Sequence, residues 1–529
     1  MTRLRTAAAV LLVAGALLVP RGGEPFTAAA FVRIPLEALA GIVLLVLLPA
    51  RARDAVAVGL GALLGLLTVL GVVDRGFRTA LGRPFDPVVD TVLLADAATF
   101  VSGSYGPGAA LAATVGAAVL AVAVPVLLAL AVRHLGRVLA PHRPVALRTA
   151  AGLAPVWLAC ALLGVQLVPG VAVASASITG QVGSTLAASW ASVLDQRQFA
   201  AQVGVDAFAD TPDAELLTAL RGKDVVVAFV ESYGRDAVTD PEFAPQIGAV
   251  LDDGTQRLAV DGFAARSGYL TSPIVGGGSW LAHATFHSGL PVTNQSRYRT
   301  LMASERRSLP GMFTDVGAST AAVMPGTAGP WPEGAFYRYD RIIDFDALDY
   351  RGPDLGWATV PDQYTLSAFQ RLTAAAGPQM AEIALVTSHA PWPFVPPLLD
   401  WAEIGDGSVY EALAPAGPRP TDLSRTEYRR SVEYSLSALI SYVETYGDDD
   451  LVLVLLGDHQ PLPVITGEGA GRDVPISIVT RDPAVLDRIA GWDWDEGLRP
   501  GERAPVWPME SFRDRFLTAF GPDGAAPTD

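Results

Sequence analysis

Five apolar runs lie within the first 170 residues, and they constrain the fold more than any other feature of this chain. The runs cover about Thr6–Pro20, Ile34–Ala50, Ala55–Val73, Pro107–Val132 and Thr149–Val168. Because a membrane-spanning helix needs about 20 mostly apolar residues, they predict an N-terminal bundle of about five transmembrane helices, residues 1–168. The first run is short and follows two arginines, which is also typical of a cleaved signal peptide. The four runs after it favour an uncleaved first helix.

The arginines of the connecting loops predict the orientation of this bundle. Cytoplasmic loops carry an excess of Lys and Arg. Arg3 and Arg5 place the N-terminus in the cytoplasm, and the arginine-rich loops 51–53 and 133–148 then also fall inside. Five spans from an inside N-terminus place everything after Val168 outside the cytoplasm. Buried helices of a soluble protein would not explain this alternation.

The rest of the chain has the composition of a water-soluble domain. It carries most of the acids behind the formal net charge of −16, and this acidic balance argues against nucleic acid as a partner. The single cysteine, Cys160, lies in an apolar run, which excludes an intrachain disulfide. We therefore expect a multi-pass protein of the cell membrane with a large domain outside the cytoplasm.

Two stretches predict strands that are buried on both faces of a sheet: Lys223–Ser232, in which six apolar residues precede Glu231, and the unbroken apolar run that starts at Leu451 and stops at Gly457. Further candidates are the strands Thr320–Met324, Glu382–Ser388 and Pro475–Thr480 and the helix Ser424–Tyr446. Strands that alternate with helices predict an α/β domain with a mostly parallel sheet covered on both faces. We expect this domain at residues 222–520, after a junction, 169–221, with an amphipathic helix at about Thr185–Phe199. Residues 521–529 form a tail.

Acidic and imidazole side chains follow the predicted strands at the point where each strand ends. Glu231 follows the first buried strand, Asp458 and His459 follow the second, and His389 follows the candidate strand 382–388. In open α/β sheets, sites are built outside the carboxyl ends of the strands. An adjacent Asp–His pair offers an oxygen and a nitrogen ligand to one metal ion. The alternative for that pair alone is a strand-to-loop turn with two solvated polar residues, but three strands that deliver Glu, His and Asp–His to one edge favour a site.

A glycine-rich loop, residues 276–278, precedes a short helical pattern that begins at Ser279 and stops at Gly289. The glycines allow close approach of the backbone to a ligand. A helix N-terminus favours anions, so a hydroxyl there is well placed to attack a phosphorus atom. The alternative is a capping serine after a flexible loop. His283 and His287 share one helical face with Ser279, and we expect His283 to reach the substrate and His287 to pack behind it.

These motifs resemble those of the alkaline phosphatase/sulfatase superfamily, and within it the lipoteichoic acid synthases and phosphoethanolamine transferases. The resemblance rests on Val-Glu-Ser-Tyr-Gly at Glu231, Gly-Gly-Gly-Ser at Ser279, Leu-Gly-Asp-His-Gln-Pro at Asp458 and Thr-Ser-His-Ala-Pro-Trp at His389, and it spans nearly the whole chain. It implies that Glu231, Ser279, Asp458 and His459 are metal ligands, that Ser279 is also the nucleophile, and that His389 binds substrate. Gly278 and Trp280, which flank the nucleophile, are expected to contact substrate as well.

Three departures from the patterns of the superfamily refine this expectation. The nucleophile is Ser279 where the synthases have Thr, although the superfamily phosphatases use Ser. The sequence after Ser279, Trp-Leu-Ala-His, lacks the Pro and Arg that sulfatases need to make formylglycine, so true sulfatase activity is not expected. The residues of a second zinc site have no clear match. We therefore expect one divalent metal, with Mn²⁺ favoured by the ligand set and Zn²⁺ or Mg²⁺ as alternatives.

The expected function is that of a membrane-anchored phosphoryl-group transferase that works through a phospho-Ser intermediate. The resemblance implies a membrane lipid as donor and a cell-envelope glycan or lipid as acceptor. Two alternatives stay open at this point. One is a membrane-tethered phosphodiesterase or phosphatase that uses the same site, and the other is a non-catalytic sulfatase-like scaffold.

Overall fold

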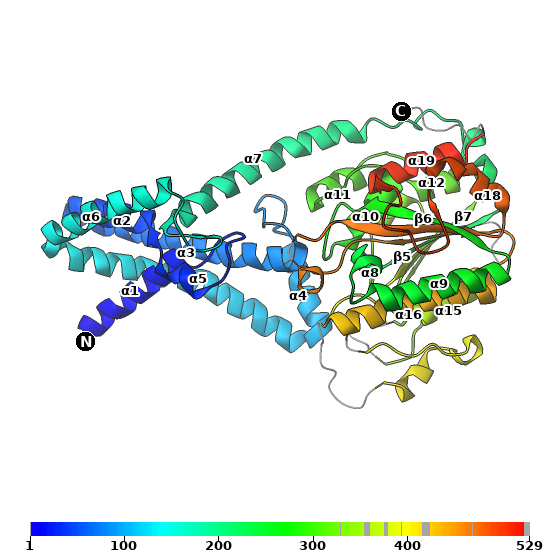
Figure 1. Ribbon diagram of the computed structural model, residues 1–529, viewed down its shortest axis with the longest axis horizontal. Coiled ribbons are helices and arrows are strands. Elements are labelled where there is room, and N and C mark those ends of the chain that lie inside the picture. Colours follow the sequence, from blue (N-terminus) through cyan, green and yellow to red (C-terminus); the bar gives the residue numbers. More distant parts are fainter. Residues whose placement is uncertain are drawn as a thin grey trace. The chain divides into compact units, whose positions relative to one another are not determined.

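The computed structural model in Figure 1 describes residues 2–327, 329–353, 360–374, 379–392, 394–414, 424–467 and 469–522. The chain divides into two compact units, Met1–Thr79 with Arg83–Leu194, and Ala80–Gly82 with Asp195–Asp529. Most of the predicted tail, residues 523–529, lies outside the described residues.

Helices form on all five apolar runs of the N-terminal unit. The α-helices of residues 2–203 are α1 (Thr2–Leu18), α2 (Leu36–Leu47), α3 (Ala50–Leu81), α4 (Leu93–Tyr105), α5 (Pro107–Leu139), α6 (Arg143–Leu162) and α7 (Ser177–Val203). The predicted amphipathic helix lies within α7, whose last residues belong to the second unit. Two described stretches, Ala50–Leu81 and Pro107–Leu162, are long and apolar enough to cross a membrane. The 12 residues of α2 extend only about 18 Å, less than the roughly 30 Å of a bilayer core, so the count of five spans stays a prediction.

Small residues let α3 approach α5 within the N-terminal unit. A Cβ atom on Gly61 would lie 2.5 Å from the Cα atom of Ala129, and one on Gly65 would lie 2.3 Å from the Cα atom of Pro125. Small residues four positions apart allow this backbone approach, which is common between helices in membranes.

The C-terminal unit is built on a nine-stranded sheet. Its order is β12 (Asp495–Glu496), β6 (Ala264–Thr271), β11 (Asp473–Thr480), β10 (Leu451–Gly457), β5 (Asp224–Val230), β9 (Gln379–Leu385), β7 (Ser319–Met324) and β8 (Arg341–Asp344), with β13 (Val506–Pro508) beside β6. The strands from β10 to β8 are parallel to one another, whereas β11 is antiparallel to both of its neighbours. The prediction of a mostly parallel sheet is confirmed.

Helices cover both faces of this sheet, because β5 and β10 are apolar on both sides. Val226, Ala228 and Val230 pack with α9 (Ala244–Val260), α15 (Asp362–Thr373) and α16 (Arg425–Tyr446). Val225, Val227 and Phe229 pack with α10 (Ser279–Ser288), α12 (Leu309–Asp315) and α19 (Phe512–Ala519). Figure 1 shows these two groups of helices on opposite sides of the sheet.

The register brings the ends of three central strands to one level. In β5, Val230 pairs with Gly457 of β10 on one side and with Leu385 of β9 on the other. The next residues of each strand therefore emerge side by side. The predicted strand 382–388 was too long at its end: β9 stops at Leu385, because the buried carboxylate of Asp362 accepts the N–H groups of the two residues after it and turns the chain.

Candidate active site and metal centre

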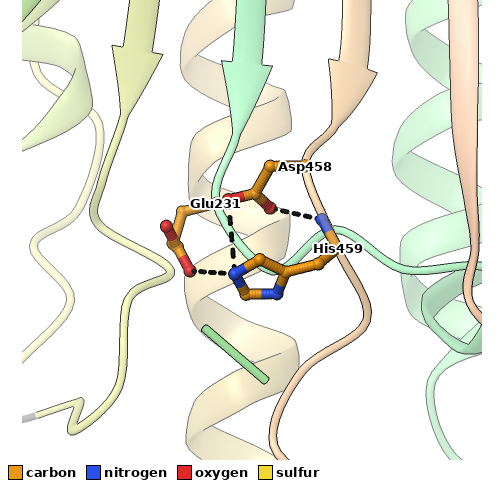
Figure 2. A group of neighbouring side chains, drawn as sticks. All are labelled: Glu231, Asp458 and His459. Carbon is orange, nitrogen blue, oxygen red and sulfur yellow. Dashed lines mark hydrogen bonds and ion pairs between the residues drawn. The ribbon is translucent and has the colours of Figure 1, made fainter. Parts of the chain in front are cut away.

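Glu231, Asp458 and His459 form a buried cluster at the carboxyl ends of β5 and β10. One ligand atom from each residue lies within 4.8 Å of the other two. The Nε2 atom of His459 is 3.4 Å from Oε1 of Glu231 and 3.5 Å from Oδ2 of Asp458. Figure 2 shows the three side chains converging where neighbouring strands end. The structure thus brings together the residues that the sequence predicted as metal ligands.

The loops after β5 and β10 are tied to each other by the backbone. A Cβ atom on Gly457 would lie 1.9 Å from the carbonyl oxygen of Tyr233, so only glycine fits there. Ser232 adopts a left-handed conformation with φ of 56°, which is uncommon for a residue with a side chain and is typical of functional sites. The N–H groups of Ser232 and His459 both donate to Oδ1 of Asp458, at 2.7 Å. Asp458 is therefore oriented by the backbone of both loops.

The tautomer of His459 follows from the contact that its Nδ1 atom makes with the backbone. Nδ1 lies 2.8 Å from the carbonyl oxygen of Gln460, which can only accept, so Nδ1 donates. Nε2 is then the nitrogen left for a metal ion, as in most metal-binding histidines.

Ser279 begins α10 and its hydroxyl reaches this cluster. Oγ donates to Oε2 of Glu231 at 2.8 Å and lies 3.3 Å from Nε2 of His459. Gly278 precedes it with φ of 91°, a conformation that favours glycine. The glycine loop is held in place because the N–H group of Gly276 donates to the carbonyl oxygen of Gln460. The nucleophile predicted from the sequence thus lies within hydrogen-bonding distance of a predicted metal ligand.

Two buried carboxylates share this site, and their pKa values are shifted in opposite directions. Burial raises the pKa of Asp458, and the nearby Glu231 carboxylate raises it further. Burial acts in the same direction on Glu231, but the charges of His459 and His389 and the bonds from hydroxyl groups outweigh it and lower its pKa. Neighbouring carboxylates whose pKa values are shifted in opposite directions are a common feature of catalytic and metal sites.

The donor set fits a divalent cation. Two carboxylates, one imidazole nitrogen and one hydroxyl converge, and among the described residues no Lys or Arg side chain forms an ion pair with Glu231 or Asp458. Two buried carboxylates without a positive partner are costly, and a dication would offset that cost.

The other predicted site residues occupy different positions around the cluster. His389 is half-buried, and its Nδ1 atom lies 2.6 Å from the carbonyl oxygen of Ala390. Burial lowers the pKa of His389, although the charge of Glu231 acts in the opposite direction. Ser388, just before it, donates its hydroxyl to the main-chain carbonyl oxygen of Glu231 at 2.6 Å. Trp280 is 37% exposed, and its ring N–H group donates to the side chain of Gln295.

His283 and His287 both face a buried acid that sequence reasoning missed. Glu382 lies within β9, and its Oε1 atom is 2.6 Å from Nδ1 of His283, while Oε2 is 2.9 Å from Nε2 of His287. Tyr339 donates its hydroxyl to Oε2 as well. The available signal was an acidic residue inside an apolar strand; nothing in the sequence identified its partners.

Residues 223–472 match the family model described as Sulfatase, and this range contains Glu231, Ser279, Asp458 and His459. The C-terminal unit therefore carries a sulfatase-family domain, which confirms the predicted class of enzyme. No curated protein matches the chain.

Among solved structures, the chain is similar to the integral membrane lipooligosaccharide phosphoethanolamine transferase A from Neisseria meningitidis, with 13% identity, 97% of this chain and 95% of that chain covered, and a TM-score of 0.46. It is also similar to the lipoteichoic acid synthase LtaP from Listeria monocytogenes, with 15% identity, coverages of 62% and 81%, and a TM-score of 0.38. A third is the C-terminal periplasmic domain of EcEptC from Escherichia coli in complex with Zn, with 13% identity, coverages of 57% and 82%, and a TM-score of 0.39.

Proposed function

We propose that this protein is a membrane-anchored, metal-dependent phosphoryl-group transferase that acts outside the cytoplasm through a phospho-Ser279 intermediate. One observation carries the proposal: the hydroxyl of Ser279, at the N-terminus of α10, lies 2.8 Å from Glu231 within the cluster of Glu231, Asp458 and His459. A nucleophile, a candidate metal site and a helix N-terminus that favours anions thus meet at one point.

Glu231, Asp458, His459 and Oγ of Ser279 would hold one divalent cation, Mn²⁺ before Zn²⁺ or Mg²⁺, which when bound lowers the pKa of the serine hydroxyl and polarises a phosphoryl oxygen. The residues of the chain provide the geometry. Glu231 accepts the hydroxyl hydrogen bond of Ser279 and so orients Oγ. The N-terminus of α10 stabilises the negative charge that develops on the phosphoryl group.

The proposed reaction has two displacements. Oγ of Ser279 forms a bond to phosphorus, the bond from phosphorus to the alcohol of the donor breaks, and that alcohol leaves with a proton while the serine loses one. The hydroxyl of an acceptor then attacks phosphorus and loses its proton, the bond from phosphorus to Oγ breaks, and Oγ takes up a proton, which restores the hydroxyl of Ser279. His389, His283, Gly278 and Trp280 are proposed to contact the substrate during these steps.

The proposed donor is a membrane lipid with a phosphorylated head group, and the proposed acceptor is a glycan or lipid of the cell envelope. Two described helical stretches long enough to span a membrane and the distribution of arginines support this location. The description Sulfatase does not decide the reaction, because the Trp-Leu-Ala-His that follows Ser279 lacks the Pro and Arg required for formylglycine.

Mass spectrometry of the Ser279 peptide tests the proposal. The full chain in detergent, incubated with Mn²⁺ and total membrane lipids, should gain a mass on Ser279 that equals the transferred group. Ser279→Ala should abolish labelling and turnover but retain most of the metal, because three ligands remain. Asp458→Ala should lose both, and His389→Ala should keep the metal but label more slowly.

Ser296→Ala is a matched control, because Ser296 lies near the start of another helix, α11 (Gln295–Met302), and its hydrogen bonds are with Asn294 and Thr300. It should label like the wild type. Turnover of Ser279→Ala at the wild-type rate would overturn the proposal. Release of the free phosphorylated head group without any alcohol acceptor would identify a hydrolase instead.

A further inference from the structure

A second buried polar cluster lies near the nucleophile, and His283 is its only member with a part in the reaction described above. Its centre is Glu382 of β9, which is 1% exposed. Three side chains converge on its carboxylate: His283 and His287 of α10, and Tyr339. Among the described residues, no Lys or Arg side chain pairs with it.

Packing alone does not account for an acid at this position. The residues beside Glu382 in the sheet are Val227 of β5 and Ala322 of β7, both apolar. Burial of a carboxylate costs several kcal/mol before its partners compensate, and apolar replacements of such buried networks are often neutral or stabilising. The two imidazoles outweigh the effect of burial and hold the pKa of Glu382 well below its usual range, so Glu382 stays ionised.

His283 connects this cluster to the metal centre. It lies one turn after Ser279 on α10, and side chains on a helix lean toward its N-terminus, here toward the nucleophile. Its ring stacks on Phe229, with ring centroids 3.9 Å apart and an angle of 13° between the planes. Phe229 lies two residues before Glu231 at the end of β5. Glu382 on one side and Phe229 on the other therefore fix both the position and the plane of the ring.

The contact with Glu382 also decides which ring nitrogen of His283 is available. The ionised carboxylate can only accept, so Nδ1 of His283 donates to it across 2.6 Å. Nε2 makes no hydrogen bond with any described residue, and the side chain is 12% exposed, whereas Glu382 and His287 are fully enclosed. His283 is thus the member of the cluster that reaches the site.

We propose that Glu382 is a positioning residue of this active site, which holds His283 through Nδ1 so that Nε2 hydrogen-bonds the group transferred by Ser279. Tyr339 supports the carboxylate through its other oxygen, in the way that outer carboxylates orient catalytic and metal-binding histidines. This inference rests on the proposed phosphoryl transfer and adds Glu382 and Tyr339 to the residues that govern it.

A double-mutant cycle with Glu382→Gln and His283→Ala tests the inference on the full chain in detergent. Glu382→Gln should lower kcat roughly 10- to 100-fold, the usual effect of removing such a partner, with little change in KM or in bound Mn²⁺. Because Glu382 acts through His283, the double variant should be no slower than His283→Ala alone. Rate losses that multiply, or a native kcat in Glu382→Gln, would overturn the inference.

A spectroscopic measurement separates positioning from folding. In the ¹⁵N-histidine-labelled protein, the Nδ1 signal of His283 should report a protonated nitrogen bonded to a carboxylate and should shift in Glu382→Gln. Tyr339→Phe removes only one hydrogen bond and should lower kcat several-fold in the same direction, so it keeps the test valid if Glu382→Gln folds poorly. Tyr442→Phe, which loses a hydrogen bond to Gln370 on the opposite face of the sheet, should leave kcat unchanged.

These experiments distinguish failure of the proposed function from failure of the positioning role of Glu382. If wild-type protein never carries a group on Ser279, the proposed function fails. If Glu382→Gln labels Ser279 at the wild-type rate and the His283 Nδ1 signal does not move, the positioning role fails and the proposed function stands.

Discussion

Side chains at the candidate metal site are hydrogen-bonded to the backbone of neighbouring loops. Oδ1 of Asp458 accepts the N–H groups of Ser232 and His459, and Ser388 donates to the main-chain carbonyl oxygen of Glu231. A hydrogen bond to a charged group contributes about 1.5–3 kcal/mol, more than one between neutral groups. The orientation of the ligands and the conformation of the loops therefore depend on the same bonds.

Asp362, which is not part of the candidate metal site, is also hydrogen-bonded to the backbone of a neighbouring loop. Its side chain is fully buried, and Oδ1 accepts the N–H groups of Val386 and Thr387 at 2.7 and 3.0 Å. Oδ2 accepts the hydroxyl of Ser435 at 2.5 Å. Burial raises the pKa of Asp362 to about 6, although these hydrogen bonds act in the opposite direction. Asp362 thus fixes the turn that leads to His389, but its ionised form is disfavoured in the folded protein.

This raised pKa predicts a specific dependence of stability on pH. The unfolded pKa is about 3.9, so the folded state binds more protons between about pH 4 and 6. The contribution of Asp362 to the free energy of unfolding is therefore present below pH 4, falls as the pH rises to about 6, and stays low above it. Asp362→Asn keeps both acceptor bonds and can donate to Ser435, so it should be more stable than wild type above pH 6, by up to about 2–3 kcal/mol.

Urea unfolding of both proteins at pH 4.5 and 7.5, followed by tryptophan fluorescence, checks this prediction. The difference between the two free energies should grow with pH. Equal differences at both pH values would show that Asp362 does not titrate in this range. Asp362→Ala, which leaves two buried N–H groups without an acceptor, should be less stable than wild type at both values.

At the scale of elements, the sequence predicted the centre of the sheet better than its edges. The strands β5 and β10 were recognised because strands that are buried on both faces form continuous apolar runs. The strand β6 was missed, because its Arg-Ser-Gly centre interrupts any apolar pattern. The four-residue strand β8 is too short to show a pattern.

The sequence likewise predicted some residues of the candidate site and its surroundings and missed others. Ser279 and Asp458 were found because each lies next to the end of an element, where a local pattern identifies it. Glu382 was missed because it lies within a strand, and Asp362, although it begins α15, was missed because its role depends on a distant partner, as that of Glu382 does: 99 residues separate His283 from Glu382 and 73 separate Asp362 from Ser435. Local periodicity carries no information about such pairs.

The close contact between Gly457, at the end of β10, and the loop after β5 leads to a prediction about both strands. A methyl group on Gly457 would meet the carbonyl oxygen of Tyr233 at 1.9 Å, and backbone cannot yield as a side chain can. Gly457→Ala should therefore separate the two strand ends, which carry Glu231 and Asp458. We expect a loss of about 1–3 kcal/mol or more in the free energy of unfolding and at least roughly tenfold weaker binding of Mn²⁺.

Gly471→Ala is the matched control, because a Cβ atom there has no neighbour within 4 Å. It should change the free energy of unfolding by less than about 0.5 kcal/mol and leave binding of Mn²⁺ intact. Calorimetric titration with Mn²⁺ and urea unfolding measure both quantities. Native affinity in Gly457→Ala would show that the ligand geometry does not depend on this close approach.

At the scale of the whole molecule, the chain joins an apolar helical unit to a sulfatase-family domain whose strands and helices enclose their own core. Two described stretches are long and apolar enough to span a membrane, and the longer one, Pro107–Leu162, contains the two helices α5 and α6. An odd number of spans is required if the N-terminus is inside and the catalytic domain outside. If α3, α5 and α6 each span once, the total is odd only when the shorter helix α1, with 17 residues, and the apolar run at α2 both span or both do not.

Reporter fusions test this topology. A reporter enzyme that is active only outside the cytoplasm should be active after Asp529 and after Pro25, but inactive after His142, in the arginine-rich loop 133–148. A fluorescent protein that folds only in the cytoplasm should give the opposite pattern at all three positions. Activity after Asp529 with none after Pro25 would mean that α1 does not span. A reporter at Asp529 that works only in the cytoplasm would contradict the outside location, and with it a donor and acceptor on the outer side of the membrane.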